Sequence, residues 1–260
     1  MLRPRVIPAL LLRDESLVKT VQFGRFSYIG DPTNTVRIFN ELEVDELAFL
    51  DITATVDGRD PNLDLLADIA DECFMPLAYG GGIRTFDQAR AILGIGYEKL
   101  VVNSHSFEDP ALITRLADHF GSQAVIASID VRRDEDGRLN VWTRSGTRNT
   151  GRDPVDWARE VEALGAGEIL LTSIDREGTW SGYDVELVRS VAQAVNIPLI
   201  AHGGAASVDD IAEAIRVGGA SAVAVGSMVV FQRKGMGVLV NFPTPEQLSA
   251  SLSTASTGSS

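Results

Sequence analysis

A chain of 260 residues, of which 45% are hydrophobic, is long enough to bury a sizeable core. Its formal net charge of −13 argues against a nucleic acid or an anionic membrane as a partner, although an acidic surface is compatible with a locally basic phosphate site. The single cysteine, Cys73, excludes an internal disulfide and a metal site built from several cysteines. No signal peptide or membrane-spanning apolar run is recognisable, so we expect a cytoplasmic protein.

Short apolar runs alternate with amphipathic stretches along the chain. Strands are predicted over residues 5–12, 46–52, 76–80, 99–104, 124–131, 168–174, 198–203 and 222–228, and helices over 62–73, 85–96, 110–121, 154–167 and 209–220. Strands that read as continuous apolar runs between helices predict a single (β/α)8 TIM barrel over residues 1–248. A doubly wound open sheet is the alternative. The Ser/Thr-rich end, residues 249–260, is expected to be a disordered tail.

An internal repeat favours the closed barrel. The segment "MPLAYGGGIR" from Met75 matches "IPLIAHGGAA" from Ile197, and "KLVVNS" matches "AVAVGS", each pair being about 122 residues apart. Two halves of four strands each would close into one barrel with pseudo-twofold symmetry. The opening strands of the two halves, "RVIPALLL" and "AVIASIDV", then make Leu11 the counterpart of Asp130.

Four loops rich in small residues follow predicted strands at the end of the barrel where such folds place their active sites. Glycines let backbone N–H groups approach an anion closely, and a following helix adds a favourable dipole. The loops after strands seven and eight are the usual phosphate site, and the repeat implies a second one after strands three and four. A ligand with phosphates at both ends fits this pattern, whereas glycines that only make tight turns are the alternative. The predicted phosphate-binding residues are Gly81, Gly82, Asn103, Ser104, Gly203, Gly204, Gly226 and Ser227.

Three aspartates are predicted at the same rim. Asp51 ends the second strand, Asp130 ends the fifth, and Asp175 follows the sixth. A carboxylate there can act as a general acid or base or bind a ligand hydroxyl, and capping of the next turn is the structural alternative. In an otherwise apolar strand, Asp130 is the candidate catalytic residue, while Asp51 and Asp175 are candidates for ligand binding. The three histidines lack the spacing of metal ligands, so neither a metal site nor a cofactor is predicted.

Charged residues open four strands at the opposite end of the predicted barrel. Such residues are usually solvated, and the alternative is an inward-pointing ring that closes the bottom; they are Arg5, Glu46, Lys99 and Glu168. Residues 13–32 make a connection long enough for a lid. Lys19 within it is a candidate to reach a ligand phosphate, and a solvated lysine is the alternative.

Several motifs together, among them "FLDITA", "GGGIR", "VNS", "FGSQAV", "SID" and "GAGEILLTSIDREGT", resemble the HisF family, the cyclase subunit of imidazole glycerol phosphate synthase, from residue 1 to about 232. The resemblance implies a barrel that takes ammonia from a HisH-like glutaminase subunit and uses it at the barrel top on a phosphorylated small molecule. There a ribulosyl-formimino intermediate is converted to imidazole glycerol phosphate and an aminoimidazole carboxamide ribotide. The resemblance also implies a flexible-loop role for Lys19, a glutaminase-interface position for Glu98, and an ammonia gate made of Arg5, Glu46, Lys99 and Glu168.

Three features depart from the family pattern, and one of them is Glu98, which stands where the family has an aspartate at the glutaminase interface. The family has essential aspartates at the tips of strands one and five, and here Asp130 matches the second while Leu11 occupies the first. A leucine cannot exchange a proton, and loss of a general acid or base typically costs ~10²–10⁴-fold in rate. Asp14 is near in sequence but lies in the predicted loop. The expected last helix is also disfavoured, by Gly235, Gly237, Pro243 and Pro245.

These departures resemble the glycosyl-amidation paralogues of surface-polysaccharide gene clusters. That resemblance implies an ammonia-conducting subunit of a glutamine amidotransferase complex, which supplies a separate sugar amidotransferase and has no cyclase reaction of its own. Two alternatives stay open. One is a cyclase of histidine biosynthesis that works without the strand-one aspartate, and the other is a non-enzymatic phosphate-binding scaffold.

Overall fold

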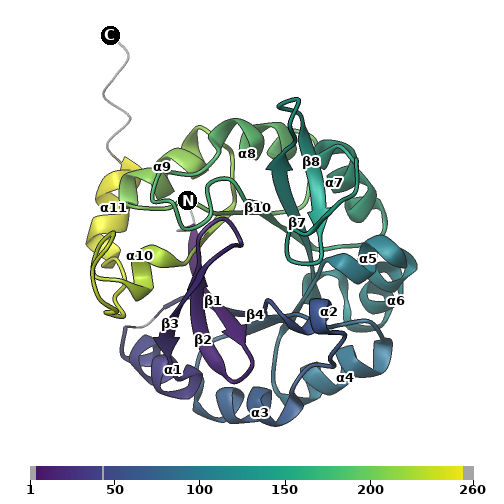
Figure 1. Ribbon diagram of the computed structural model, residues 1–260, viewed down its shortest axis with the longest axis horizontal. Helices are drawn as coiled ribbons and strands as arrows, with labels where there is room; N and C mark the ends of the chain where they lie inside the picture. Colours follow the sequence, from purple (N-terminus) through teal and green to yellow (C-terminus); the bar gives the residue numbers. More distant parts are fainter. Residues whose placement is uncertain (1–3, 43, 254–260) are drawn as a thin grey trace.

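The computed structural model describes residues 4–42 and 44–253, and its core is a closed barrel of parallel strands inside a ring of helices (Figure 1). The order around the barrel returns from the last strand to the first. In that order the strands are β1 (Arg5–Arg13), β4 (Leu47–Asp51), β5 (Leu77–Gly80), β6 (Lys99–Val102), β7 (Val125–Arg133), β10 (Glu168–Ser173), β11 (Leu199–His202) and β12 (Ala222–Val225). The predicted TIM barrel is therefore confirmed, and the open sheet is excluded.

The helices cover the outside of the barrel and connect its strands (Figure 1). They are α1 (Pro32–Glu41), α2 (Ala54–Asp57), α3 (Leu63–Glu72), α4 (Phe86–Ile95), α5 (Ser104–Glu108), α6 (Ala111–Phe120), α7 (Pro154–Ala163), α8 (Val185–Ala192), α9 (Val208–Arg216), α10 (Ser227–Val230) and α11 (Pro245–Ser253). Local sequence fixes several starts: Asp153 caps α7 ahead of Pro154, and Thr85 and Gln88 form a capping box on α4. Within the described residues, no helix is long and apolar enough to cross a bilayer.

Two antiparallel hairpins continue barrel strands beyond the carboxyl end. β2 (Ser16–Thr20) and β3 (Phe26–Gly30) extend β1, and β8 (Leu139–Thr143) and β9 (Arg148–Asn149) extend β7. Their turns use the same unusual backbone, since Gln22 and Phe23 in one turn and Arg144 and Ser145 in the other have φ between 54° and 58°. The two half-barrels thus build equivalent loops over the mouth, and the first of them lies in the segment predicted as a lid.

The barrel interior is apolar and is lined by alanines and larger aliphatic side chains. Side chains alternate between the two faces of each strand, so every second residue points inward. The inner cluster consists of Ile7, Ala9, Ala48, Ala78, Val101, Ile126, Leu170, Ile200, Ala222 and Ala224. Because residues two apart share a face, Arg5 and Leu11 lie at the bottom and top of the same inner column of β1.

The carboxyl-terminal helix corrects the sequence prediction. α11 does form, and it packs against α9 with Leu248 buried. The glycines and Pro243 precede it, and Pro245 is its first residue, where a missing N–H breaks no helical hydrogen bond. The expected boundary at residue 248 falls inside this helix, and residues 254–260 of the expected tail lie outside the described residues.

Core packing yields a matched pair of variants for stability. Phe49 on β4 is 0% exposed between the barrel and its helices, whereas Phe74 is 86% exposed. We expect Phe49→Ala to lower the free energy of unfolding by about 3–5 kcal/mol and Phe74→Ala to change it by less than ~0.5 kcal/mol. Urea denaturation measures both, and equal effects would contradict this packing.

Candidate functional site

A cavity of about 360 Å³ opens at the carboxyl ends of the barrel strands. Its walls are the glycines after β5, the loop after β6, and polar side chains from β7, β10 and β11. The polar residues at its floor are Asn103, Ser128, Asp130, Thr172 and His202. The cavity therefore lies at the end of the barrel where this fold carries its active sites.

Asp130 is held in a buried hydrogen-bonding pocket at the tip of β7. Its side chain accepts a hydrogen bond from Asn103 Nδ2 at 2.7 Å and lies 3.5 Å from the Ser128 hydroxyl. Burial raises the pKa of Asp130 to about 6, although hydrogen bonds from Asn103, Thr172 and Ser128 oppose the rise. A carboxyl group with a pKa near neutrality is suited to general acid or base chemistry.

His202 lies at the end of β11, and Thr172 of β10 stands between it and Asp130. Its Nδ1 is 3.1 Å from the Thr172 hydroxyl, and the ring is 6% exposed. Burial and the positive charge of Lys19 lower the pKa of His202 to about 4, against the opposing charge of Glu177. The imidazole is therefore neutral at pH 7. Sequence reasoning placed His202 near a phosphate loop but gave it no role.

Leu11 occupies the place in β1 that Asp130 occupies in β7. Leu11 pairs with Leu50 on β4 and with Val18 on the following hairpin strand. Asp130 pairs in the same way with Thr172 on β10 and with a residue of β8. The structure thus agrees with the equivalence inferred from the repeat. As a result, the inner column ends in a carboxyl group on β7 and in hydrocarbon on β1, although polar residues such as Arg13 and Thr20 also line the cavity.

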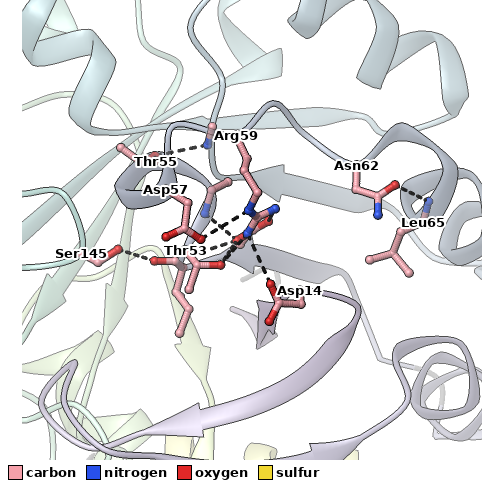
Figure 2. Close-up of polar contacts among 12 residues, drawn as sticks. Asp14, Thr53, Thr55, Asp57, Arg59, Asn62, Leu65 and Ser145 are labelled. Atoms are coloured by element: carbon pink, nitrogen blue, oxygen red, sulfur yellow. Dashed lines mark hydrogen bonds and ion pairs between the residues drawn. The ribbon is translucent and has the colours of Figure 1, made fainter.

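Asp14 does not replace the missing carboxylate of strand one. It lies in the β1–β2 turn with φ 56° and a side chain that is 78% exposed. Its carboxylate points to Arg59, 3.9 Å away (Figure 2), and it does not line the cavity. Asp51 and Asp130 both line the cavity, and neither takes the place of the missing carboxylate on β1.

The two other predicted aspartates have structural partners. Asp51 Oδ1 accepts hydrogen bonds from the backbone N–H groups of Thr53 and Ala54, both at 2.9 Å. This is the turn-capping arrangement, although Asp51 also borders the cavity. Asp175 accepts from the Arg133 N–H at 3.0 Å and lines a separate outer cavity. The structure therefore does not bring Asp175 together with Asp130.

Arg59 organises the rim around β4, and the sequence gave no sign of it. Figure 2 shows its side chain close to Asp14, Asp57 and Thr53. Arg59 donates to Thr53 Oγ1 at 2.7 Å and lies 3.4 Å from Asp57 and 3.7 Å from Asp51. This arginine offsets the negative charge that the acidic rim would otherwise concentrate beside the cavity.

The predicted phosphate-binding residues line two cavities at the mouth that differ greatly in volume. Gly81, Gly82, Asn103 and Ser104 line the 360 Å³ cavity. Gly203, Gly204, Gly226 and Ser227 instead border a separate cavity of about 10 Å³. Gly82 has φ 70°, and a Cβ there would meet the Arg59 carbonyl at 2.9 Å, so only glycine lets these loops approach. The expected symmetry is therefore present in the backbone but not in the space available.

Lys19 is buried and paired, which differs from a mobile lysine on an open lid. It forms an ion pair with Glu177, and the two side chains are 6% and 1% exposed. Glu177 also accepts hydrogen bonds from Thr20 Oγ1 at 3.0 Å and from the Phe23 N–H at 3.2 Å. The first mouth loop is thus tied down by one carboxylate. Sequence reasoning missed Glu177, because only the fold shows where a residue so distant along the chain is buried.

The four charged residues at the amino ends of the strands form one ring of ion pairs. Arg5 contacts Glu46 at 2.7 Å and Glu168 at 2.9 Å, and Lys99 contacts the same two carboxylates at 3.1 and 3.0 Å. Partial burial works to lower the pKa of Arg5, but Glu168 and Glu46 more than offset it, so the pKa is raised and the charge is kept. Glu98, beside the ring, is exposed.

The fold and this mouth define a (β/α)8-barrel protein with its polar residues above an apolar interior and a charged ring. The family model described as "Histidine biosynthesis protein" matches residues 5–234. The chain therefore belongs to this family and, within it, to the HisF group.

Similar proteins cover nearly the whole chain. A Pseudomonas aeruginosa protein named "Putative imidazole glycerol phosphate synthase subunit hisF2" is 48% identical over 95% of this chain and 99% of its own length. A Vibrio vulnificus protein named "Putative imidazole glycerol phosphate synthase subunit hisF3" is 44% identical over 95% of this chain and 95% of its own length. The "Imidazole glycerol phosphate synthase subunit HisF" of Alkaliphilus metalliredigens is 47% identical over 88% of this chain and 90% of its own.

The raised pKa of Asp130 predicts a pH-dependent cost to stability. A carboxyl group whose pKa is raised by folding favours the folded state below its unfolded pKa of about 4, and that stability is lost as pH rises through about 6. We expect Asp130→Asn to be more stable than the wild type at pH 8, by on the order of 2 kcal/mol, with the difference vanishing near pH 4. Urea unfolding across this range measures it.

A control variant separates this effect from general surface charge. Asp136 is exposed in the turn after β7, and Asp136→Asn removes the same charge outside the cavity. If Asp136→Asn gained as much stability over the wild type with rising pH as Asp130→Asn, burial of Asp130 would not explain the gain.

Proposed function

We propose that the protein is an ammonia-conducting subunit of a glutamine amidotransferase complex. The support comes from the column that runs up the barrel, with a charged ring at one end, an apolar interior and an open cavity at the other. Neutral ammonia is compatible with the apolar barrel interior, whereas the ammonium ion would incur the large cost of burying an unpaired charge. The paired ring of Arg5, Glu46, Lys99 and Glu168 acts as the gate.

A HisH-type glutaminase is the proposed partner at the ring end of the barrel. The relatives are named as synthase subunits, which supports an assembly of more than one chain. Glu98 is exposed next to Lys99 of the ring, so a partner docked there would release ammonia directly over the gate.

The ammonia acceptor is proposed to be a sugar, amidated by a separate enzyme at the mouth in surface-polysaccharide synthesis. The observation that carries this proposal is Leu11, because the mouth lacks the second of two symmetry-related carboxylates and has hydrocarbon in its place. Loss of one of the two acid–base groups that such a ring closure uses is expected to slow it by ~10²–10⁴-fold. A phosphorylated small molecule remains the proposed ligand of the mouth.

A cyclase of histidine biosynthesis is the second candidate function. It is favoured by Asp130, whose buried carboxyl group keeps a pKa of about 6 at the floor of a cavity that holds the glycine loop after β5. In this reading Asp130 alone performs the acid–base steps, and the rate is correspondingly low.

Cyclase turnover distinguishes the two candidates. With the ribulosyl-formimino substrate and excess ammonium salt, we expect a rate at least ~10²-fold below that of a HisF cyclase that has both aspartates. Leu11→Asp should raise this rate. Leu11→Asn should not, because asparagine matches aspartate in size but has no ionisable group. A wild-type rate within about tenfold of the two-aspartate cyclase would reject the sugar-amidation proposal.

Glutaminase stimulation tests the proposed partnership. A HisH-type glutaminase should release ammonia from glutamine faster when this protein is added, because docking over the ring completes the passage. Glu98→Arg, which reverses an exposed charge at the proposed interface, should weaken the stimulation, and Glu213→Arg on α9 serves as the control. No stimulation in the presence of phosphorylated ligands would favour the scaffold alternative.

A further inference from the structure

The segment after α10, residues 231–242, has an ordered structure that serves neither the ring nor the cavity. It turns back on itself through a β-bridge between Phe231 and Val238, and its two ends, Phe231 and Phe242, pack against the main core. Every residue of the tip, 232–239, is nevertheless exposed. The tip also contains two of the glycines by which the chain departs from the HisF pattern. The segment is therefore a fixed projection, and the barrel itself does not explain it.

Large apolar side chains are exposed on this tip and on the β2–β3 hairpin. Because β12 pairs with β1 in the barrel, the connections that leave their carboxyl ends are neighbours, and Figure 1 shows both on the same side of the barrel. A cluster of exposed apolar residues with a polar border is typical of an interaction surface. Half of the large hydrophobic residues that are exposed in the described part of the chain lie here, at 45–65% exposure: Val21, Phe26, Tyr28, Met236, Val238 and Leu239.

The loop after β10 joins the hairpin and the tip into one surface. A Cβ placed on Gly178 would lie 2.9 Å from Val21 Cα, so this loop runs directly against the hairpin turn. Further along the same loop, the Thr179 carbonyl accepts a hydrogen bond from the Lys234 ammonium of the tip at 3.0 Å. The loop after β10 belongs to the mouth end of the barrel, and the surface therefore lies at that end.

The charge of this surface is opposite in sign to that of the whole chain. Residues 20–28 and 231–242 contain no aspartate or glutamate, although the chain has 36, and they carry the cations Arg25, Arg233 and Lys234. A second copy of the chain would bring these cations face to face, and the net charge of −13 opposes an anionic membrane. The surface therefore fits a protein whose own apolar patch is bordered by carboxylates.

We propose that residues 20–28 and 231–242 form the docking surface for the separate enzyme that amidates the sugar. This inference rests on the proposed ammonia-conducting function. Phe26 belongs to the surface and also lines the cavity, so an enzyme seated here would cover the opening from which ammonia leaves. Because the tip is already fixed in place, docking does not have to order it. The glutaminase and the amidating enzyme then occupy opposite ends of one barrel.

Glutamine-dependent amidation tests the docking surface. The assay combines this protein, a HisH-type glutaminase and the sugar amidotransferase encoded alongside it. Leu239→Asp and Tyr28→Asp each place a negative charge in one of the two segments. We expect each variant to lower glutamine-dependent amidation by about tenfold or more, because like charges across an interface repel. Glutaminase stimulation and amidation driven by excess ammonium salt should stay unchanged, since neither requires ammonia to pass to a docked enzyme.

A matched control and a binding measurement complete the test. Ile38→Asp adds the same charge at a 41% exposed residue of α1, outside the surface, and should behave as the wild type. Sedimentation velocity should show a complex with the amidotransferase that Leu239→Asp and Tyr28→Asp lose and Ile38→Asp keeps. Met236→Asp replaces either surface variant if it fails to fold.

The outcomes separate the docking surface from the proposed function. Full glutamine-dependent activity of both surface variants, or an equal loss in Ile38→Asp, overturns the docking surface alone. The same holds if the two variants abolish binding to phosphatidylglycerol vesicles or dimers of this chain while the complex with the amidotransferase persists. Absence of glutamine-dependent amidation with the wild type overturns the proposed function and the docking surface together.

Discussion

The constraint on which the rest of the structure depends is the two-residue alternation of side chains in a closed barrel. Because the barrel has a single interior, residues spaced by two along β1 stand above one another, from Arg5 through Ile7 and Ala9 to Leu11. The ring, the apolar interior and the mouth are therefore three levels of one continuous column of side chains.

The half-barrel repeat supplies two copies of each structural device, and the protein uses the copies differently. The mouth turns at Gln22 and Arg144 share a left-handed backbone, and the strands before them are paired in the same way. Yet one strand ends its inner column in Leu11 and the other in Asp130. A symmetric backbone thus carries an asymmetric set of charges, which is how one half of the mouth becomes a polar site while the other becomes a wall.

Much of this was predictable from sequence, for a physical reason. Strands buried on both faces read as apolar runs, and a repeat shows itself by matching letters, so the barrel and the pairing of Leu11 with Asp130 could be inferred. The hairpin strands β3 and β9 were missed because they are mostly exposed and lack such runs. Glu177 was missed because its partner is set by folding: Lys19 and Glu177 are 158 residues apart. Arg59 was missed although its partners Thr53 and Asp57 are close to it along the chain. The sequence argued against α11 because of nearby glycines and prolines. These residues lie before the helix or, in the case of Pro245, at its first position.

The Lys19–Glu177 pair has a consequence for how this chain can evolve. Removing one member of a buried ion pair costs about 3–5 kcal/mol, whereas replacing both with apolar residues of similar volume is often neutral. Single substitutions at either position would therefore be purged, and a lineage that changes one must change the other almost at once. Related chains should then fall into two groups, with both charges or with neither, and the boundary between them would mark where the mouth loop changed its ligand.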